Sequence, residues 1–250
     1  MEEILLRIGI REINDSIKET VNQTFTSIEL KLKDKNYNFN IKIQDYESLK
    51  KEFNEYKIKW FEENNIKGLS ESNKKIILFN NSFFKDTTNI NKQSVFLHEI
   101  GHITNPLPNN IKGFDMSIIY KEFLADNFLF KIDENIFNKG RVEEDVKLTN
   151  FNNIKENINK IKNNNVNYPN QDIIVKFIMV GGRFSYYDSF HRENLLINKV
   201  NDLIKFIKEQ ISEKDWLILN EIKDLCNNFR DIDKGLNENF KDIQNKINTY

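Results

Sequence analysis

Two histidines four residues apart, His98 and His102 in the stretch HEIGH, constrain this 250-residue chain more than any other feature. On an α-helix, positions i and i+4 lie on one face, one turn apart, so both imidazoles can reach a single metal ion. Glu99 follows the first histidine at a different angle, from which its carboxylate can reach a water on the metal. This is the His-Glu-x-x-His pattern of zinc hydrolases, and it predicts a helix that binds Zn²⁺.

The motif helix is predicted over residues 91–104. Pro106 disfavours helical geometry at the residue before it, and Pro108 reinforces the stop. After a loop, residues 117–132 place apolar side chains at helical spacing and predict a second helix, with Ser117 as its cap. The two helices are therefore expected to follow each other closely in space.

A third ligand is needed, because a catalytic zinc usually takes three protein ligands and leaves one position for water. The second helix offers Glu122 and Asp126, which are four residues apart and share one face. We predict Glu122 as the third ligand and Asp126 as the acid that holds the outer nitrogen of a ligand histidine. Asp126 lies in an otherwise apolar stretch, where a charge needs a partner. Gly101 either lets another backbone approach this face or is a tolerated helix glycine.

The rest of the pattern predicts an α+β fold that is predominantly helical, with a small sheet. Residues 38–44 alternate apolar side chains on one face, and residues 74–80 form an apolar run of strand length, so both are predicted strands. Residues 2–32 and 46–63 have apolar side chains at helical spacing and predict helices. The stretch GLSES, residues 68–72, is typical of a turn.

The C-terminal half is predicted to be almost wholly helical. The candidate helices are residues 142–162, 170–180, 193–213, 214–229 and 235–248. We expect a metal-binding core over residues 1–135 and a helical region over 136–250 that completes the cleft. One continuous domain is the alternative.

Composition excludes several classes of partner and site. The formal net charge of −1 provides no electrostatic footprint for nucleic acid, so none is predicted as a partner. The single cysteine, Cys226, excludes an internal disulfide and a cysteine-rich zinc site. The first residues lack the pattern of a signal peptide, and no apolar run approaches the about 18 residues of a membrane span. A cytoplasmic protein without a membrane partner is therefore predicted.

The segments KKIILFN, VFLHEIGHI and KEFLADNFLF together resemble zinc metallopeptidases of the gluzincin type, and among these the ImmA/IrrE family. The matching positions are His98, Glu99, Gly101, His102, Glu122, Ala125 and Phe128. The resemblance covers about residues 38–131 and implies a zincin-like core and a protein substrate, such as a repressor or another intracellular regulator. Residues 189–200 are weakly similar to the phage-exclusion Lit-like proteases, although Arg192 stands where they have proline.

Three hypotheses follow for the function. In the first, the chain is a zinc endopeptidase in which Glu99 is the general base for a metal-activated water. The oxyanion would then need a donor, and His191, Tyr187 and Tyr186 are the candidates, with packed or surface side chains as the alternative. In the second, the chain is a non-catalytic regulatory or binding protein that keeps a structural zinc site. In the third, it is a metal-free helical interaction protein.

Overall fold

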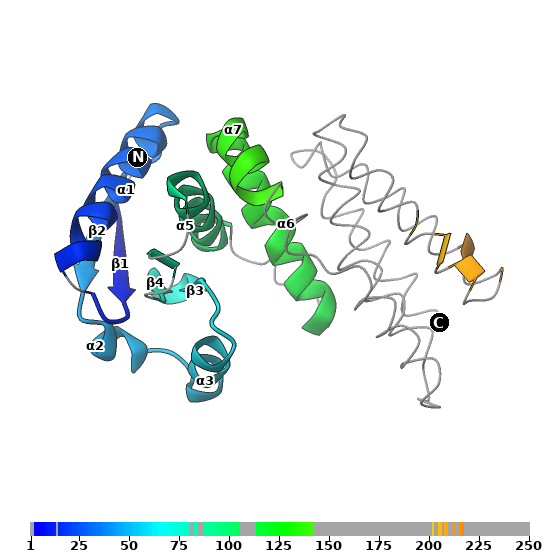
Figure 1. The fold of residues 1–250 in the computed structure, drawn as a ribbon, viewed down its shortest axis with the longest axis horizontal. Coiled ribbons are helices and arrows are strands. Elements are labelled where there is room, and N and C mark those ends of the chain that lie inside the picture. Colours follow the sequence, from blue (N-terminus) through cyan, green and yellow to red (C-terminus); the bar gives the residue numbers. More distant parts are fainter. Residues whose placement is uncertain are drawn as a thin grey trace. The chain divides into compact units, whose positions relative to one another are not determined.

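The computed structural model describes residues 3–13, 15–80, 83–84, 88–105 and 114–142, with scattered positions between 202 and 217. The described residues form an α+β, mostly helical arrangement around one four-stranded sheet (Figure 1). In chain order the elements are β1 (Ile4–Ile10), α1 (Asp15–Asp34), β2 (Phe39–Gln44), α2 (Tyr46–Lys50), α3 (Glu55–Glu63), β3 (Gly68–Glu71), η1 (Ser72–Lys74), β4 (Ile76–Phe79), α5 (Asn89–Thr104), α6 (Phe114–Ile132), α7 (Glu134–Ile136) and the π-helical segment η2 (Phe137–Val142).

The sheet is mixed and has the strand order β2-β1-β4-β3. Strand β1 runs parallel to both of its neighbours, and Ile8 is aligned with Ile43 of β2 and Ile77 of β4. Strand β3 runs antiparallel to β4, with Leu69 opposite Leu78. In this sheet β3 is therefore an edge strand, and the turn η1 returns the chain from it to β4.

Helices cover both faces of the sheet. On one face, Phe96 of α5 lies 5.4 Å from Phe79 of β4 and 4.6 Å from Phe25 of α1, measured between ring centroids. On the other face, α2 and α3 pack with the sheet in a second apolar cluster. Its buried members are Tyr46, Leu49, Phe53, Ile58, Phe61, Leu69, Ile76 and Leu78. Helix α5 is thus held on the sheet by aromatic packing, which provides a firm base for the residues on its opposite face.

Helices α5 and α6 approach each other at Gly101. A Cβ atom on this glycine would lie 2.7 Å from the Cα atom of Ala125 and 2.8 Å from its carbonyl oxygen. Ala125 is itself fully buried. The prediction that Gly101 allows another backbone to approach is confirmed, and this contact brings the acidic residues of α6 next to the histidine face of α5.

Several predicted elements are confirmed. The predicted strands at 38–44 and 74–80 are β2 and β4, and the motif helix predicted at 91–104 is α5. Helix α5 begins at Asn89, because Thr88 accepts a hydrogen bond from the backbone N–H of Asn91. Helix α6 ends at Ile132 as predicted, but begins three residues before Ser117, at Phe114.

Three predictions of secondary structure are wrong. Residues 4–10 form strand β1, not part of a helix over 2–32. The buried side chains of Leu6, Ile8 and Ile10 lie at every second position, and β1 is paired with a strand on both sides. Residues 68–71 form strand β3, not a turn.

The helix predicted over 46–63 is divided into α2 and α3. The division occurs because Asn54 accepts a hydrogen bond from the N–H of Tyr56, at 2.9 Å, and caps a new helix.

The chain divides into two compact units. One comprises residues 1–107 and 121–144, and the other comprises residues 108–120 and 145–250. Every described residue of the candidate site lies in the first unit. The helices predicted beyond residue 142 lie outside the described residues, apart from scattered helical positions between 202 and 217. No helix in the described ranges has the length and apolar character needed to cross a bilayer.

Candidate metal centre

The histidines of α5 lie on one face of the helix, as their four-residue spacing requires. Their ring centroids are 4.7 Å apart, and the rings are nearly perpendicular. His98 is almost fully buried, and Glu99 is buried beside it. The possible ligand atoms of His98, Glu99 and His102 all lie within 4.8 Å of one another. These three side chains therefore form a compact donor cluster at the end of the helix.

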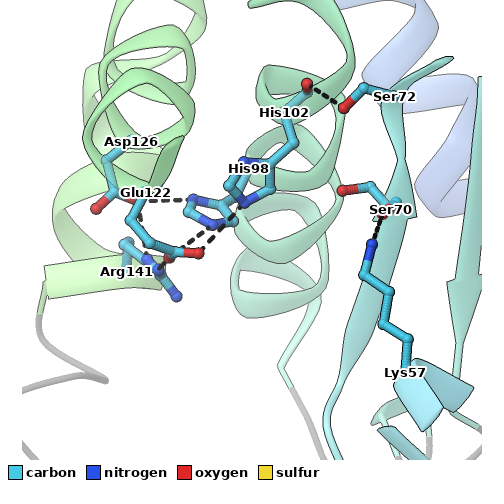
Figure 2. Close-up of polar contacts among 8 residues, drawn as sticks. All are labelled: Lys57, Ser70, Ser72, His98, His102, Glu122, Asp126 and Arg141. Atoms are coloured by element: carbon cyan, nitrogen blue, oxygen red, sulfur yellow. Dashed lines mark hydrogen bonds and ion pairs between the residues drawn. The ribbon is translucent and has the colours of Figure 1, made fainter. Parts of the chain in front are cut away.

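Helix α6 adds a carboxylate to this cluster. Oε2 of Glu122 lies 3.3 Å from Nε2 of His98, and Oε1 lies 3.5 Å from Nε2 of His102 (Figure 2). In a tetrahedral zinc site with bonds of about 2.0–2.2 Å, neighbouring ligand atoms are about 3.3–3.5 Å apart. Each carboxylate oxygen of Glu122 thus lies at this separation from one imidazole nitrogen, and two imidazoles with a carboxylate are donors that suit Zn²⁺. The Glu122 side chain is 32% exposed, whereas the side chains of His98 and His102 are only 6% and 12% exposed.

Asp126 contacts the other nitrogen of His98. Its Oδ1 lies 2.7 Å from Nδ1 of His98, and its side chain has no solvent exposure. This contact favours a proton on Nδ1, so that in the neutral imidazole Nε2 is the nitrogen that can coordinate a metal.

Arg141 of η2 completes the polar cluster. Its Nε donates a hydrogen bond to Oδ1 of Asp126 at 3.0 Å, and its Nη2 lies 3.5 Å from Oε2 of Glu122. Sequence reasoning missed this residue. A signal was present, because the charge of Asp126 in an apolar stretch requires a partner. However, Lys121, Lys131 and Lys139 all lie closer to these acids in sequence than Arg141 does, so spacing could not select the arginine.

The electrostatics of the cluster follow from these contacts. Burial and the charge of Arg141 lower the pKa of His98, but Asp126 and Glu122 outweigh both and raise it to about 9. Burial favours the neutral form of Glu122, yet its contacts with His102 and His98 hold the pKa of this carboxyl well below the usual range. Burial acts in the same way on Asp126, whose pKa is nevertheless lowered by Arg141 and His98. Both carboxylates are therefore ionised at neutral pH.

Glu99 lies on the side of α5 that faces strand β3. A Cβ atom on Gly68 would be 2.9 Å from Cγ of Glu99 and 3.1 Å from its Oε1. The turn η1, which follows β3, is bonded to the same helix: Oγ of Ser72 donates a hydrogen bond to the carbonyl oxygen of His102 at 2.7 Å. The motif helix and the edge strand are thus in direct contact at Glu99.

The ladder between β3 and β4 sets the direction of the edge-strand backbone groups. The carbonyl oxygen of Lys67 accepts a hydrogen bond from the N–H of Asn80 at 3.2 Å, so alternate residues from Lys67 onward face β4. Gly68 and Ser70 consequently direct their N–H and C=O groups away from the sheet. Nζ of Lys57 lies 3.4 Å from the carbonyl oxygen of Ser70, consistent with this direction (Figure 2).

Five of the side chains predicted for the site lie together in the structure: His98, Glu99, His102, Glu122 and Asp126. The three candidate oxyanion donors, His191, Tyr186 and Tyr187, lie outside the described residues.

Comparison with known proteins adds no relatives. No protein-family model, curated protein or solved structure matches this chain. The likeness to the ImmA/IrrE family therefore stays a prediction from the motifs, and the functional argument depends on the geometry of the cluster.

Proposed function

We propose that this protein is a zinc-dependent endopeptidase with a zincin-like core. The observation that supports this most is the arrangement of Glu122 against two histidines, with N–O separations of 3.3 and 3.5 Å. His98, His102 and Glu122 would hold Zn²⁺ and leave a fourth position for water, as catalytic zinc sites do. Glu99, the fourth polar group of the cluster, would remain outside the ligand set.

The chemistry divides between the metal and the side chains. Zinc bound here would lower the pKa of a water molecule towards about 7 and polarise the scissile carbonyl. Glu99 accepts the proton of the attacking water and delivers it to the leaving amine, so the carboxylate is restored at the end of the reaction. Asp126 keeps Nε2 of His98 directed at the ligand position throughout.

The edge strand supports a peptide substrate in extended conformation. Gly68 and Ser70 direct backbone groups outward beside Glu99, and an extended chain can add to such an edge through main-chain hydrogen bonds. A peptide that is bound there would lie against the motif helix. The proposed substrate is therefore a protein segment in extended conformation, and the resemblance to the ImmA/IrrE family implies part of a repressor or another regulator.

The test is the pairing of metal content with peptide cleavage. Protein purified without chelator is expected to contain about one zinc per chain. It is also expected to cleave a mixture of unfolded protein fragments, with the products identified by mass spectrometry. Glu99→Gln should abolish this cleavage and retain the zinc, because the amide cannot accept a proton. Glu122→Gln should lower the zinc content.

The matched control is Glu29→Gln, which removes an exposed carboxylate from α1 and should change neither property. A wild-type protein that binds no zinc on titration contradicts the proposal, as does cleavage that survives Glu99→Gln. Zinc binding without any cleavage that depends on Glu99 favours the non-catalytic alternative, in which the metal is structural.

A further inference from the structure

We propose that Arg141 is a positioning residue of the metal centre, which holds both carboxylates of α6 in the orientation that faces the histidines. This inference rests on the proposed zinc site and adds a residue to it. Arg141 does not contact the histidine nitrogens in any described interaction. It acts through Glu122 and Asp126.

The contacts of Arg141 with the two acids of α6 involve one edge of the guanidinium group. Nε reaches Asp126 at 3.0 Å and Nη2 reaches Glu122 at 3.5 Å, so a single planar group spans two carboxylates (Figure 2). The Arg141 side chain is only 16% exposed. A lysine ammonium is a point charge without this fork, and could not hold both acids in the same geometry.

Oδ1 of Asp126 is shared between Arg141 and the metal centre. This oxygen accepts the hydrogen bond from Nε of Arg141 and also lies 2.7 Å from Nδ1 of His98. The position of the guanidinium therefore sets the position of the oxygen that orients the histidine. Glu122 and Asp126 lie one turn apart on one helix face, so a guanidinium group that contacts both also holds their side chains together.

The segment that presents Arg141 is fastened to the motif helix. Oγ of Ser94 donates a hydrogen bond to the carbonyl oxygen of Gly140 at 2.8 Å, and Ser94 is fully buried. A Cβ atom on Gly140 would lie 2.7 Å from the carbonyl oxygen of Ile90, so only glycine allows this contact. Ser94 precedes His98 by four residues and lies on the histidine face. Segment η2 therefore packs against α5 one turn before His98, and Arg141 lies beside the acids of α6.

This arrangement links the two ligand helices through protein contacts alone. Ligands that are held in place before the metal arrives bind it more tightly than ligands that must be ordered on binding. The short π-helical form of η2 fits this role, since π-helical turns are frequent at functional sites.

The experiment measures zinc affinity by competition with a chelator, and the visible spectrum of the Co²⁺-substituted protein. Arg141→Gln is expected to raise the Kd for zinc by about 10–100-fold, the range for residues that orient metal ligands. It should also shift the Co²⁺ spectrum. Arg141→Lys should lie between Arg141→Gln and the wild type. Lys139→Gln is the matched control, because it removes an exposed positive charge from the same segment and should change neither readout.

A double-mutant cycle tests the route of the effect. If Arg141 acts partly through Asp126, Arg141→Gln should cost less affinity in an Asp126→Asn background than in the wild type. A purely structural role predicts the same loss in both backgrounds.

The outcomes separate this inference from the proposed function. Wild-type protein that binds no zinc refutes the metal centre and the role of Arg141 with it. Zinc binding and a Co²⁺ spectrum that are unchanged in Arg141→Gln overturn the positioning role alone, whether or not the protein cleaves peptides. If Arg141→Gln does not fold, Arg141→Lys decides, because wild-type affinity and spectrum in that variant contradict a requirement for the fork.

Discussion

At the residue scale, Gly68 leaves the space that the Glu99 side chain occupies. A methyl group at position 68 would meet Cγ and Oε1 of Glu99, which can swing away because the side chain is flexible. We therefore expect Gly68→Ala to fold and to displace the carboxylate. A misplacement of about 1 Å near a reacting group can cost about 100-fold, so kcat/KM for peptide cleavage should fall on this order.

The zinc content of Gly68→Ala should equal that of the wild type, because the ligands do not contact the new methyl group. Ser70→Ala is the control, since it changes a side chain on the same face of β3 without adding bulk. Wild-type kcat/KM in Gly68→Ala would mean that Glu99 does not need its observed position.

Local spacing predicted the residues that lie on two consecutive helices. His98 and His102, and likewise Glu122 and Asp126, are each four residues apart, and helical geometry alone places each pair on one face. Arg141 could not be predicted in this way. Its position depends on a π-helical turn and on the docking of Gly140 against Ser94, which are tertiary contacts. The position of Gly68 also depends on a tertiary contact, because a strand that is distant in sequence lies beside Glu99.

At the element scale, strand β3 provides a test of the substrate-binding edge. The N–H of Ser70 faces away from β4, so Ser70→Pro removes no hydrogen bond from the ladder. We expect this variant to fold and to bind zinc like the wild type. Peptide cleavage should fall strongly, because the edge loses a donor and acquires a bulky ring.

Leu69→Pro is the contrasting variant. The backbone N–H of Leu69 faces β4, so proline at this position removes a ladder hydrogen bond. Leu69→Pro should therefore unfold at a lower denaturant concentration than Ser70→Pro. Cleavage at the wild-type rate by Ser70→Pro would exclude β3 as the binding edge.

The contact between α5 and α6 makes a second element-scale prediction. In a helix interior, alanine is more favourable than glycine by about 1 kcal/mol of free energy, so Gly101→Ala would stabilise an isolated helix. In this protein the new Cβ atom would meet backbone atoms of Ala125, which cannot move without shifting α6. We expect a net loss of about 1–3 kcal/mol in the free energy of unfolding, measured with denaturant, because overpacked sites cost this much. Weaker zinc binding should accompany it, and an unchanged or higher stability would contradict the observed close approach.

Elements with a clear local pattern were predictable, and strands that depend on their partners were not. The apolar runs of β2 and β4 and the helical spacing of α5 and α6 each determine their element locally. Strand β1 mixes alternating and helical spacing, and its pairing on both sides decides the outcome. Strand β3 begins with Gly68, a residue type that is depleted in strands, so its pairing with β4 imposes the extended form.

At the scale of the whole molecule, metal binding and stability should respond to pH in opposite directions. In the metal-free protein, the pKa of His98 is raised to about 9 from an ordinary value of 6.5. The stability that arises from its contacts with Asp126 and Glu122 is then fully present below about pH 6.5 and lost as the pH rises through about 9. The lowered pKa values of the two carboxylates act on the acid side, where stability is lost as they become protonated.

Zinc requires neutral imidazoles, so its affinity should rise over the same interval in which the metal-free protein becomes less stable. Denaturant unfolding at pH 6, 7.5 and 9, with chelator and with excess zinc, measures both trends. His98→Gln should remove most of the alkaline slope of the metal-free protein. A metal-free protein that gains stability between pH 6.5 and 9 would contradict the ion pairs of the buried cluster.

The shortness of β3 limits the length of substrate that the proposed enzyme could bind at this edge. Four residues extend over about 13 Å, so few main-chain bonds can form and recognition is confined to a short piece of chain. A helix or a paired strand cannot offer its backbone to that edge, because its own hydrogen bonds already use the groups required. We expect cleavage to occur in exposed linkers and loops, so that the folding state of the target, as much as its sequence, decides whether it is cut.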